Sequence, residues 1–237
     1  MKYSKIVFRN LCIKYNLTKQ DETTIYRSIK PILFHKEFIK RLDKEFYHHG
    51  TTTLGEHILE DTIITYKLAK NKDINLDLAL KISMMHDLYT TPWQNNPINK
   101  QNTFHRHGFS HPIDAAINSM VWFKKEFKNP RKAEILIDGI VHHMYPLPVT
   151  AFYTSNTNEL ELDNFDLIKK IDKRNIKILI DSSNRNKIGK VSLSRSKYKE
   201  GRIMSKADKK VTLKQLTNVN DYTSLVTGYN KSIINNE

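Results

Sequence analysis

The chain has 237 residues and a formal net charge of +14, because 39 Lys and Arg outnumber 25 Asp and Glu. A hydrophobic content of 39% is sufficient for a buried core and excludes a disordered chain. Seven Gly and seven Pro are few for the turns of a sandwich or barrel, so the composition favours helices. The single cysteine, Cys12, excludes an internal disulfide framework.

The charge and the hydropathy pattern also limit partners and location. No run of about 18 apolar residues occurs, and no apolar signal-peptide region follows Met1, so we expect a cytoplasmic protein without an integral membrane segment. The positive charge predicts an anionic partner, namely a nucleotide or other phosphorylated small molecule, a nucleic acid or a membrane surface. No particular oligomeric state is predicted.

Helices are predicted along the first part of the chain. Residues 1–45 have the pattern of short helical pieces, among them 31–44, where apolar residues recur at helical spacing. Thr53 and Glu56 have capping-box spacing, which predicts a helix from 53 to about 70. A helix from 76 to about 88 carries apolar residues on most sides and should be buried.

A loop separates these helices from the next pair. Residues 89–109 lack a hydrophobic period. Ser110 is expected to cap a helix that ends near 127. Asn129 begins another helix, which leads into His142 and His143.

The C-terminal third is basic and less regular. Residues 165–181 predict a helix, or a helix and a strand, and 182–202 predict an exposed loop or hairpin. Two final helices are expected over 204–216 and 222–234. The predicted fold is therefore an all-α helical bundle with a basic, partly irregular C-terminal segment and a small β-hairpin near 177–195. Its expected parts are an N-terminal helical segment packing on the core (1–45), a metal-binding domain (46–216) and a C-terminal helix or tail (217–237).

Histidine and aspartate recur at the ends of the predicted helices. The candidate ligands are His57, His86, Asp87, His111, His143 (or its neighbour His142) and Asp208. Imidazole and carboxylate groups that converge from several helices are how a bundle builds a metal site. Such donors suit one or two divalent ions of Fe, Mn, Zn, Ni or Mg. Glu60 and Asp61, by contrast, are interpreted as surface residues or as supports of the ligands.

The spacing of these residues is similar to that of a known superfamily. His57, the adjacent pair His86-Asp87 and a distant Asp208 resemble the ligand set of the HD-domain metal-dependent phosphohydrolases. The resemblance covers roughly residues 45–215 and implies an all-helical fold. The segments around His49, His107 to His111 and His143 look more narrowly like uncharacterised bacterial HD-domain proteins.

The resemblance implies a second metal and sets limits on the activity. His111 and His143 match two further histidines of branches with a dinuclear centre, which Asp87 would bridge. The cyclic-di-nucleotide phosphodiesterase branch has a Lys where this chain has Thr90, and its Gly-Tyr-Pro motif lacks the Gly before Tyr145 here. Activity on cyclic dinucleotides is therefore not predicted.

Roles in a hydrolase follow from the resemblance and from the neighbouring basic residues. The expected catalytic residues are His86, Asp87 and His107. The proton donor to the leaving oxygen would be His107, or alternatively His105 or His49. The expected substrate-binding residues are Arg106, Lys206, Lys209 and His49.

Three functions from different classes fit this pattern. The first is a phosphohydrolase, a phosphomonoesterase or phosphodiesterase, that acts on a nucleotide or related phosphate ester through a metal-activated water. The same six ligands are similar to those of mixed-valent diiron oxygenases of the superfamily. The third is a nucleic-acid-binding protein with a vestigial site, which only the basic segment supports.

The charge is concentrated in one segment. Residues 169–214 contain 16 Lys and Arg and four acidic residues, a net charge of +12, so the other 191 residues together carry +2. This segment leads into the last candidate ligand, Asp208, and would form an electropositive rim that focuses a phosphorylated substrate on the site.

Neutralising four residues of this rim tests its role. Replacing Lys187, Lys190, Arg195 and Lys197 by Gln is expected to raise KM more than it lowers kcat, because the rim acts on substrate capture. Steady-state kinetics at low and high salt measure the effect. An unchanged KM would assign the segment to solubility alone.

Overall fold

The structure is a computed structural model that describes residues 3–49, 52–90, 107–147, 149–153, 179–180, 187–192 and 194–217. Most of these residues are helical, as the composition predicts. The helices are α1 (Tyr3–Lys14), α2 (Lys19–Leu33), α3 (Lys36–Lys40), α4 (Leu54–Ala69), α5 (Leu76–Met85), α6 (His107–Trp122), α7 (Pro130–Val141) and α9 (Lys199–Thr217), with a 3-10 turn at Lys44–Phe46. The strands are β1 (Tyr47–His49), β2 (Thr52–Thr53), β3 (Val149–Tyr153), β4 (Leu179–Ile180) and β5 (Lys187–Ser192).

Side-chain caps fix the starts of two helices that position the site. The hydroxyl of Thr53 accepts from the Glu56 amide at 3.2 Å, and the Glu56 carboxylate accepts from the Thr53 amide at 2.9 Å. The amide oxygen of Asn129 accepts from the backbone of Lys132 at 3.0 Å. Both starts are confirmed, since these oxygens satisfy amides that have no helical partner.

The prediction of a helix over 31–44 is wrong. α2 begins after the capping box of Thr18 and runs through Pro31 to Leu33. A break follows, because Nδ1 of His35 accepts from the Glu37 amide at 3.3 Å and starts the short α3. The apolar spacing that suggested one helix is therefore shared between two.

The boundaries predicted for the helix of His111 are also wrong. α6 begins at His107, three residues before the expected cap Ser110, and ends at Trp122 rather than near 127. Pro112 therefore lies inside the helix and removes one hydrogen bond, to the carbonyl of Gly108.

In the described part of the chain, two small antiparallel sheets accompany the helices. β4 pairs with β5, which confirms the small hairpin expected near 177–195. β3 pairs with the other edge of β5, in a register that joins Val149 to Ser192, and makes a three-stranded sheet. The sequence pattern predicts no strand at β3, whose partner lies almost forty residues later in the chain. The final helix expected over 222–234 lies outside the described residues, as does most of 165–181.

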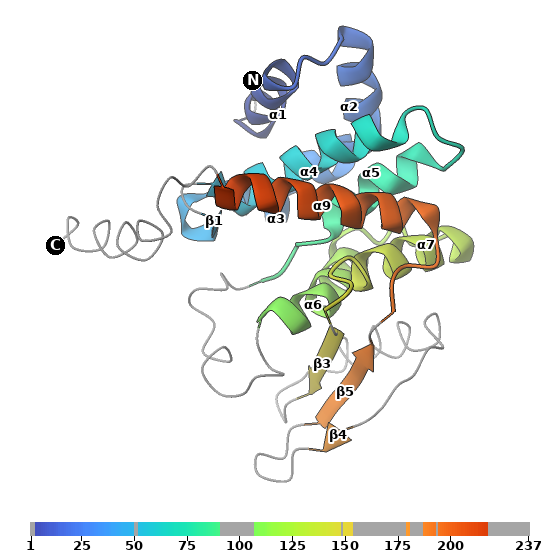
Figure 1. The fold of residues 1–237 in the computed structure, drawn as a ribbon. Coiled ribbons are helices and arrows are strands. Elements are labelled where there is room, and N and C mark those ends of the chain that lie inside the picture. The colour runs from blue at the N-terminus through green and yellow to red at the C-terminus, as the bar shows by residue number, and fades with distance from the viewer. Residues whose placement is uncertain are drawn as a thin grey trace, which may run out of the picture.

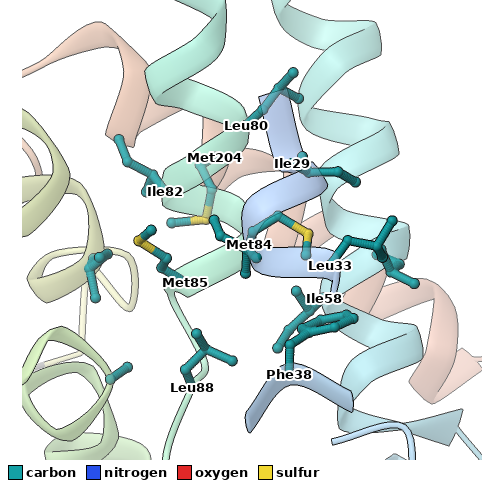
Figure 2. Close-up of a cluster of buried hydrophobic side chains, with 14 of the residues drawn as sticks. Ile29, Leu33, Phe38, Ile58, Leu80, Ile82, Met84, Met85, Leu88 and Met204 are labelled. Atoms are coloured by element: carbon teal, nitrogen blue, oxygen red, sulfur yellow. The ribbon is translucent and has the colours of Figure 1, made fainter. Parts of the chain in front are cut away.

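The core brings helices from both ends of the chain together. Figure 2 shows fully buried side chains from α2, α4, α5 and α9, among them Ile29, Ile58, Met84 and Met204. Phe8 of α1 belongs to the same cluster. Helices α1 to α3 therefore pack on the core that carries the candidate ligands.

Helix α9 lies across the bundle. Figure 1 shows it over α4 and α5, and it also contacts α7. Two glycines allow the approach to α7: a Cβ on Gly201 would lie 2.7 Å from Cα of Gly139 and 2.4 Å from the hydroxyl of Ser196. This close crossing sets the position of Asp208, two turns further along α9, against the end of α7.

In the ranges that the structure describes, we find no helix with both the length and the apolar character of a membrane span.

The close crossing predicts that a side chain at position 201 destabilises the protein. Gly201→Ala is expected to lower the free energy of unfolding by about 1–3 kcal/mol, because backbone of α7 would have to shift. Gly108→Ala is the matched control: a Cβ there meets nothing within 4 Å, so stability should stay equal or rise by up to about 1 kcal/mol. Urea unfolding followed by circular dichroism measures both, and equal effects would contradict the close crossing.

Candidate metal centre

Five helices deliver the predicted ligands to one place in the interior. His57 lies in the first turns of α4, His86 caps the end of α5 and Asp87 follows it. The remaining ligands are His111 in α6, His143 just after α7 and Asp208 in α9. Each of the six residues has at most 7% of its surface exposed. Because polar groups are costly to bury singly, their clustering indicates a shared function.

One half of the cluster holds two imidazoles and two carboxylates. His57, Asp61, His86 and Asp208 each offer a ligand atom, and these atoms lie within 4.8 Å of one another. Nε2 of His57 is 3.0 Å from Oδ2 of Asp61 and 3.6 Å from Oδ1 of Asp208. Nε2 of His86 is 3.3 Å from the same Asp61 oxygen.

Asp87 joins this half to two further imidazoles. Its Oδ1 lies 3.1 Å from Nε2 of His111 and 3.5 Å from Nε2 of His143. Its Oδ2 lies 3.5 Å from Nε2 of His86. The two oxygens of Asp87 thus face opposite halves of the cluster, and His143, rather than its neighbour His142, is the histidine that belongs to the group.

Comparison with protein families, with curated proteins and with solved structures found no match to this chain.

Hydrogen bonds to the backbone orient two of the imidazoles. Nδ1 of His86 lies 2.7 Å from the carbonyl of Ser83, and Nδ1 of His143 lies 2.7 Å from the carbonyl of Ile140. A carbonyl only accepts, so Nδ1 carries the proton in each ring. The lone pair of the neutral ring is then at Nε2, which faces the cluster, as metal-binding histidines require.

Several buried atoms of the cluster have no hydrogen-bond partner among the described residues. They include both carboxylate oxygens of Asp61, Oδ1 of Asp87 and Nε2 of His86. Leaving such atoms unsatisfied costs about 1–3 kcal/mol each, and more for charged groups. Ligation of a cation would satisfy all of them, so the residues present could hold a metal ion.

The pKa values of His86 and Asp208 show that neighbouring charges of the cluster outweigh the effect of burial. Burial lowers the pKa of His86, but Asp87 and Asp61 outweigh burial and raise it to about 9. Burial likewise raises the pKa of Asp208, but hydrogen bonding to His57 and the nearby His86 lower it to about 2. At neutral pH the carboxyl group of Asp208 is therefore ionised and the imidazole of His86 is protonated, and a bound cation would replace the proton on His86.

The interpretation of Asp61 as a surface residue is wrong. Asp61 has no exposed surface and shares the cluster with His57. A residue four positions later in a helix returns to the same face, so the spacing itself was a usable signal. Glu60 is also buried, and it contacts Gln215 rather than the ligands.

Of the other expected site residues, only some lie where their position relative to the cluster is described. Lys209 donates to the carbonyl of His143 at 3.4 Å and to the hydroxyl of Ser205 at 2.6 Å, beside Asp208. Lys206 lies on the exposed side of α9. Arg106 lies outside the described residues. His49 and His107 are described only as backbone positions in β1 and α6, so their predicted roles stay predictions.

A further histidine lies at the cluster without having been predicted there. His48 on β1 is half-buried, and its ring centroid lies 4.0 Å from that of His57. Its Nδ1 is 3.5 Å from the hydroxyl of Tyr89. Because β1 is a short strand with no hydrophobic pattern, only the fold brings this residue to the site.

The place of Asp61 in the cluster can be tested by thermal unfolding. Added Mn²⁺ should raise the Tm of the wild-type protein, since an ion that binds only the folded state stabilises it. Asp61→Asn is expected to weaken binding about 100-fold or more and to remove most of this shift. Asp73→Asn, the same change at an exposed position, should keep it. A full shift in Asp61→Asn would exclude Asp61 as a ligand.

Proposed function

We propose that the protein is a metal-dependent phosphohydrolase, a phosphomonoesterase or phosphodiesterase that acts on a nucleotide or a related phosphate ester. One observation carries the proposal: four imidazoles and three carboxylates from five helices form a single buried cluster with unsatisfied donor atoms. The HD-domain resemblance of His57, His86-Asp87 and Asp208 supports the same reading. Metal identity remains within Fe, Mn, Zn, Ni and Mg, because the donors are nitrogen and oxygen only.

The residues would hold ions in two neighbouring positions. His57, Asp61, His86 and Asp208 would hold one, and His111 and His143 would contribute to the second, with Asp87 between them. Divalent ions held there would lower the pKa of a bound water molecule and would stabilise the charge on the phosphoryl oxygens.

The protein's own side chains prepare this chemistry. The backbone bonds of His86 and His143 keep each Nε2 turned to the cluster, so little rotation is needed when an ion binds. The surrounding helices exclude bulk water, which strengthens each electrostatic contact. Lys209 holds the carbonyl of His143, and the basic segment 169–214 would attract the phosphate. Nucleic acid as a partner has no support beyond this charge.

A diiron oxygenase is the second candidate, because the same two-ion cluster would also suit two iron ions. His111 and His143 place their Nε2 atoms 3.0 Å apart next to Asp87, so both halves of the cluster carry histidine ligands. Anaerobic loading with iron and electron paramagnetic resonance separate the two functions. A mixed-valent signal with substrate-dependent O₂ uptake would favour the oxygenase over the hydrolase.

The hydrolase proposal predicts loss of activity in two variants. His86→Ala and Asp87→Asn are expected to lose phosphatase and phosphodiesterase activity by a factor of about 100 or more, because each removes a ligand. Asp77→Asn in α5 is the control, since its carboxylate is partly exposed and pairs with Lys81. Activity is measured on a panel of nucleotides and phosphate esters with each metal. Metal-loaded wild-type protein that hydrolyses none of them would contradict the proposal.

A further inference from the structure

His57 is oriented differently from the other two imidazoles whose Nδ1 contacts are described above. His86 and His143 follow helix ends, where the last carbonyls have no helical amide partner and can accept from Nδ1. His57 lies at the beginning of α4, where the carbonyls of the preceding turn accept from helix amides. Its Nδ1 therefore needs an acceptor from elsewhere in the chain.

Gln215 supplies this acceptor from the last turns of α9. Its Oε1 lies 3.0 Å from Nδ1 of His57, although 158 positions separate the two residues. Its Nε2 donates to Oε2 of Glu60 at 2.9 Å. Both side chains are buried, so this contact is shielded from water.

The contact with Glu60 decides which way the amide of Gln215 points. A carboxylate only accepts, so the NH₂ group must face Glu60 and the carbonyl oxygen must face His57. That oxygen also only accepts, so Nδ1 of His57 carries a proton. The lone pair of the neutral ring is then at Nε2, on the side of Asp61 and Asp208.

Glu60 is itself held from two other helices. The hydroxyl of Tyr15, just after α1, donates to its Oε1. The ammonium groups of Lys14 and Lys214 each lie 3.3 Å from the same oxygen. These donors fix the carboxylate, leaving Oε2 for Gln215.

We propose that Gln215, fixed by Glu60, is a positioning residue that sets the tautomer and ring orientation of His57 for metal binding. This inference rests on the metal centre of the proposed function but not on the reaction catalysed. It makes α1 and the end of α9 part of the site, although neither contributes a ligand through these residues.

The test is a Co²⁺ titration of the full chain, followed by the visible absorption of the bound ion. Gln215→Leu keeps the approximate volume and removes the acceptor. We expect its affinity for Co²⁺ to fall about 10–100-fold, the usual cost of losing a partner of a metal-binding histidine. Gln20→Leu, the same change at an exposed position of α2, should bind as the wild type does.

A swap of the two side chains separates hydrogen bonding from packing. In Gln215→Glu, two carboxylates face each other, and the affinity should fall. In the double variant Glu60→Gln with Gln215→Glu, Gln at 60 can donate to Glu at 215, which still accepts from His57. We expect this double variant to bind Co²⁺ at least about tenfold more tightly than Gln215→Glu alone, which a packing role would not produce.

The outcomes are distinguishable. Wild-type affinity in Gln215→Leu, or no rescue in the double variant, overturns the inference, and so does a wild-type protein that takes up no Co²⁺. If Gln215→Leu does not fold, as judged by circular dichroism, the comparison of Gln215→Glu with the double variant decides. The expected Co²⁺ pattern in a protein that hydrolyses no phosphate ester would support the inference and contradict the proposed hydrolase.

Discussion

Three carboxylates and four imidazoles occupy the interior of a small helical bundle. Each carboxylate needs an imidazole nearby to offset the cost of burying its charge, and this requirement constrains the rest of the structure. A buried carboxylate without a partner is too costly to retain, so Asp61, Asp87 and Asp208 must each lie within reach of an imidazole. The helices that deliver these groups therefore have to converge on one point. Helix α5 contacts both α4 and α7, and α9 lies across all three (Figure 1).

Packing of the apolar core holds the helices in this convergent arrangement. Ile58 and Met84 are fully buried on the same two helices that carry His57 and His86, so burial of their faces aligns the polar ends as well (Figure 2). The close contact of Gly139 and Gly201 brings α7 and α9 together. Packing and the site are thus two results of the same helix arrangement, and a shift of α9 would move Asp208 and Gln215 together.

The orientation of the imidazoles depends on where each one lies in its helix. At a helix end, a free carbonyl three residues before the ring is available at no further cost, as for His86 and His143. At a helix start no such carbonyl exists, and His57 depends on Gln215 and Glu60 instead. This difference explains why residues far from the ligands in sequence belong to the site.

Local patterns were enough to predict the helical class, the capped starts at Thr53 and Asn129 and the six candidate ligands, because caps, apolar periods and the His-Asp pair can each be recognised in the sequence. Only the tertiary packing brings Gln215 to His57 and pairs β3 with β5. It also placed His143 rather than His142 at Asp87. These contacts join positions distant in the chain or select between neighbouring residues, so no local pattern encodes them.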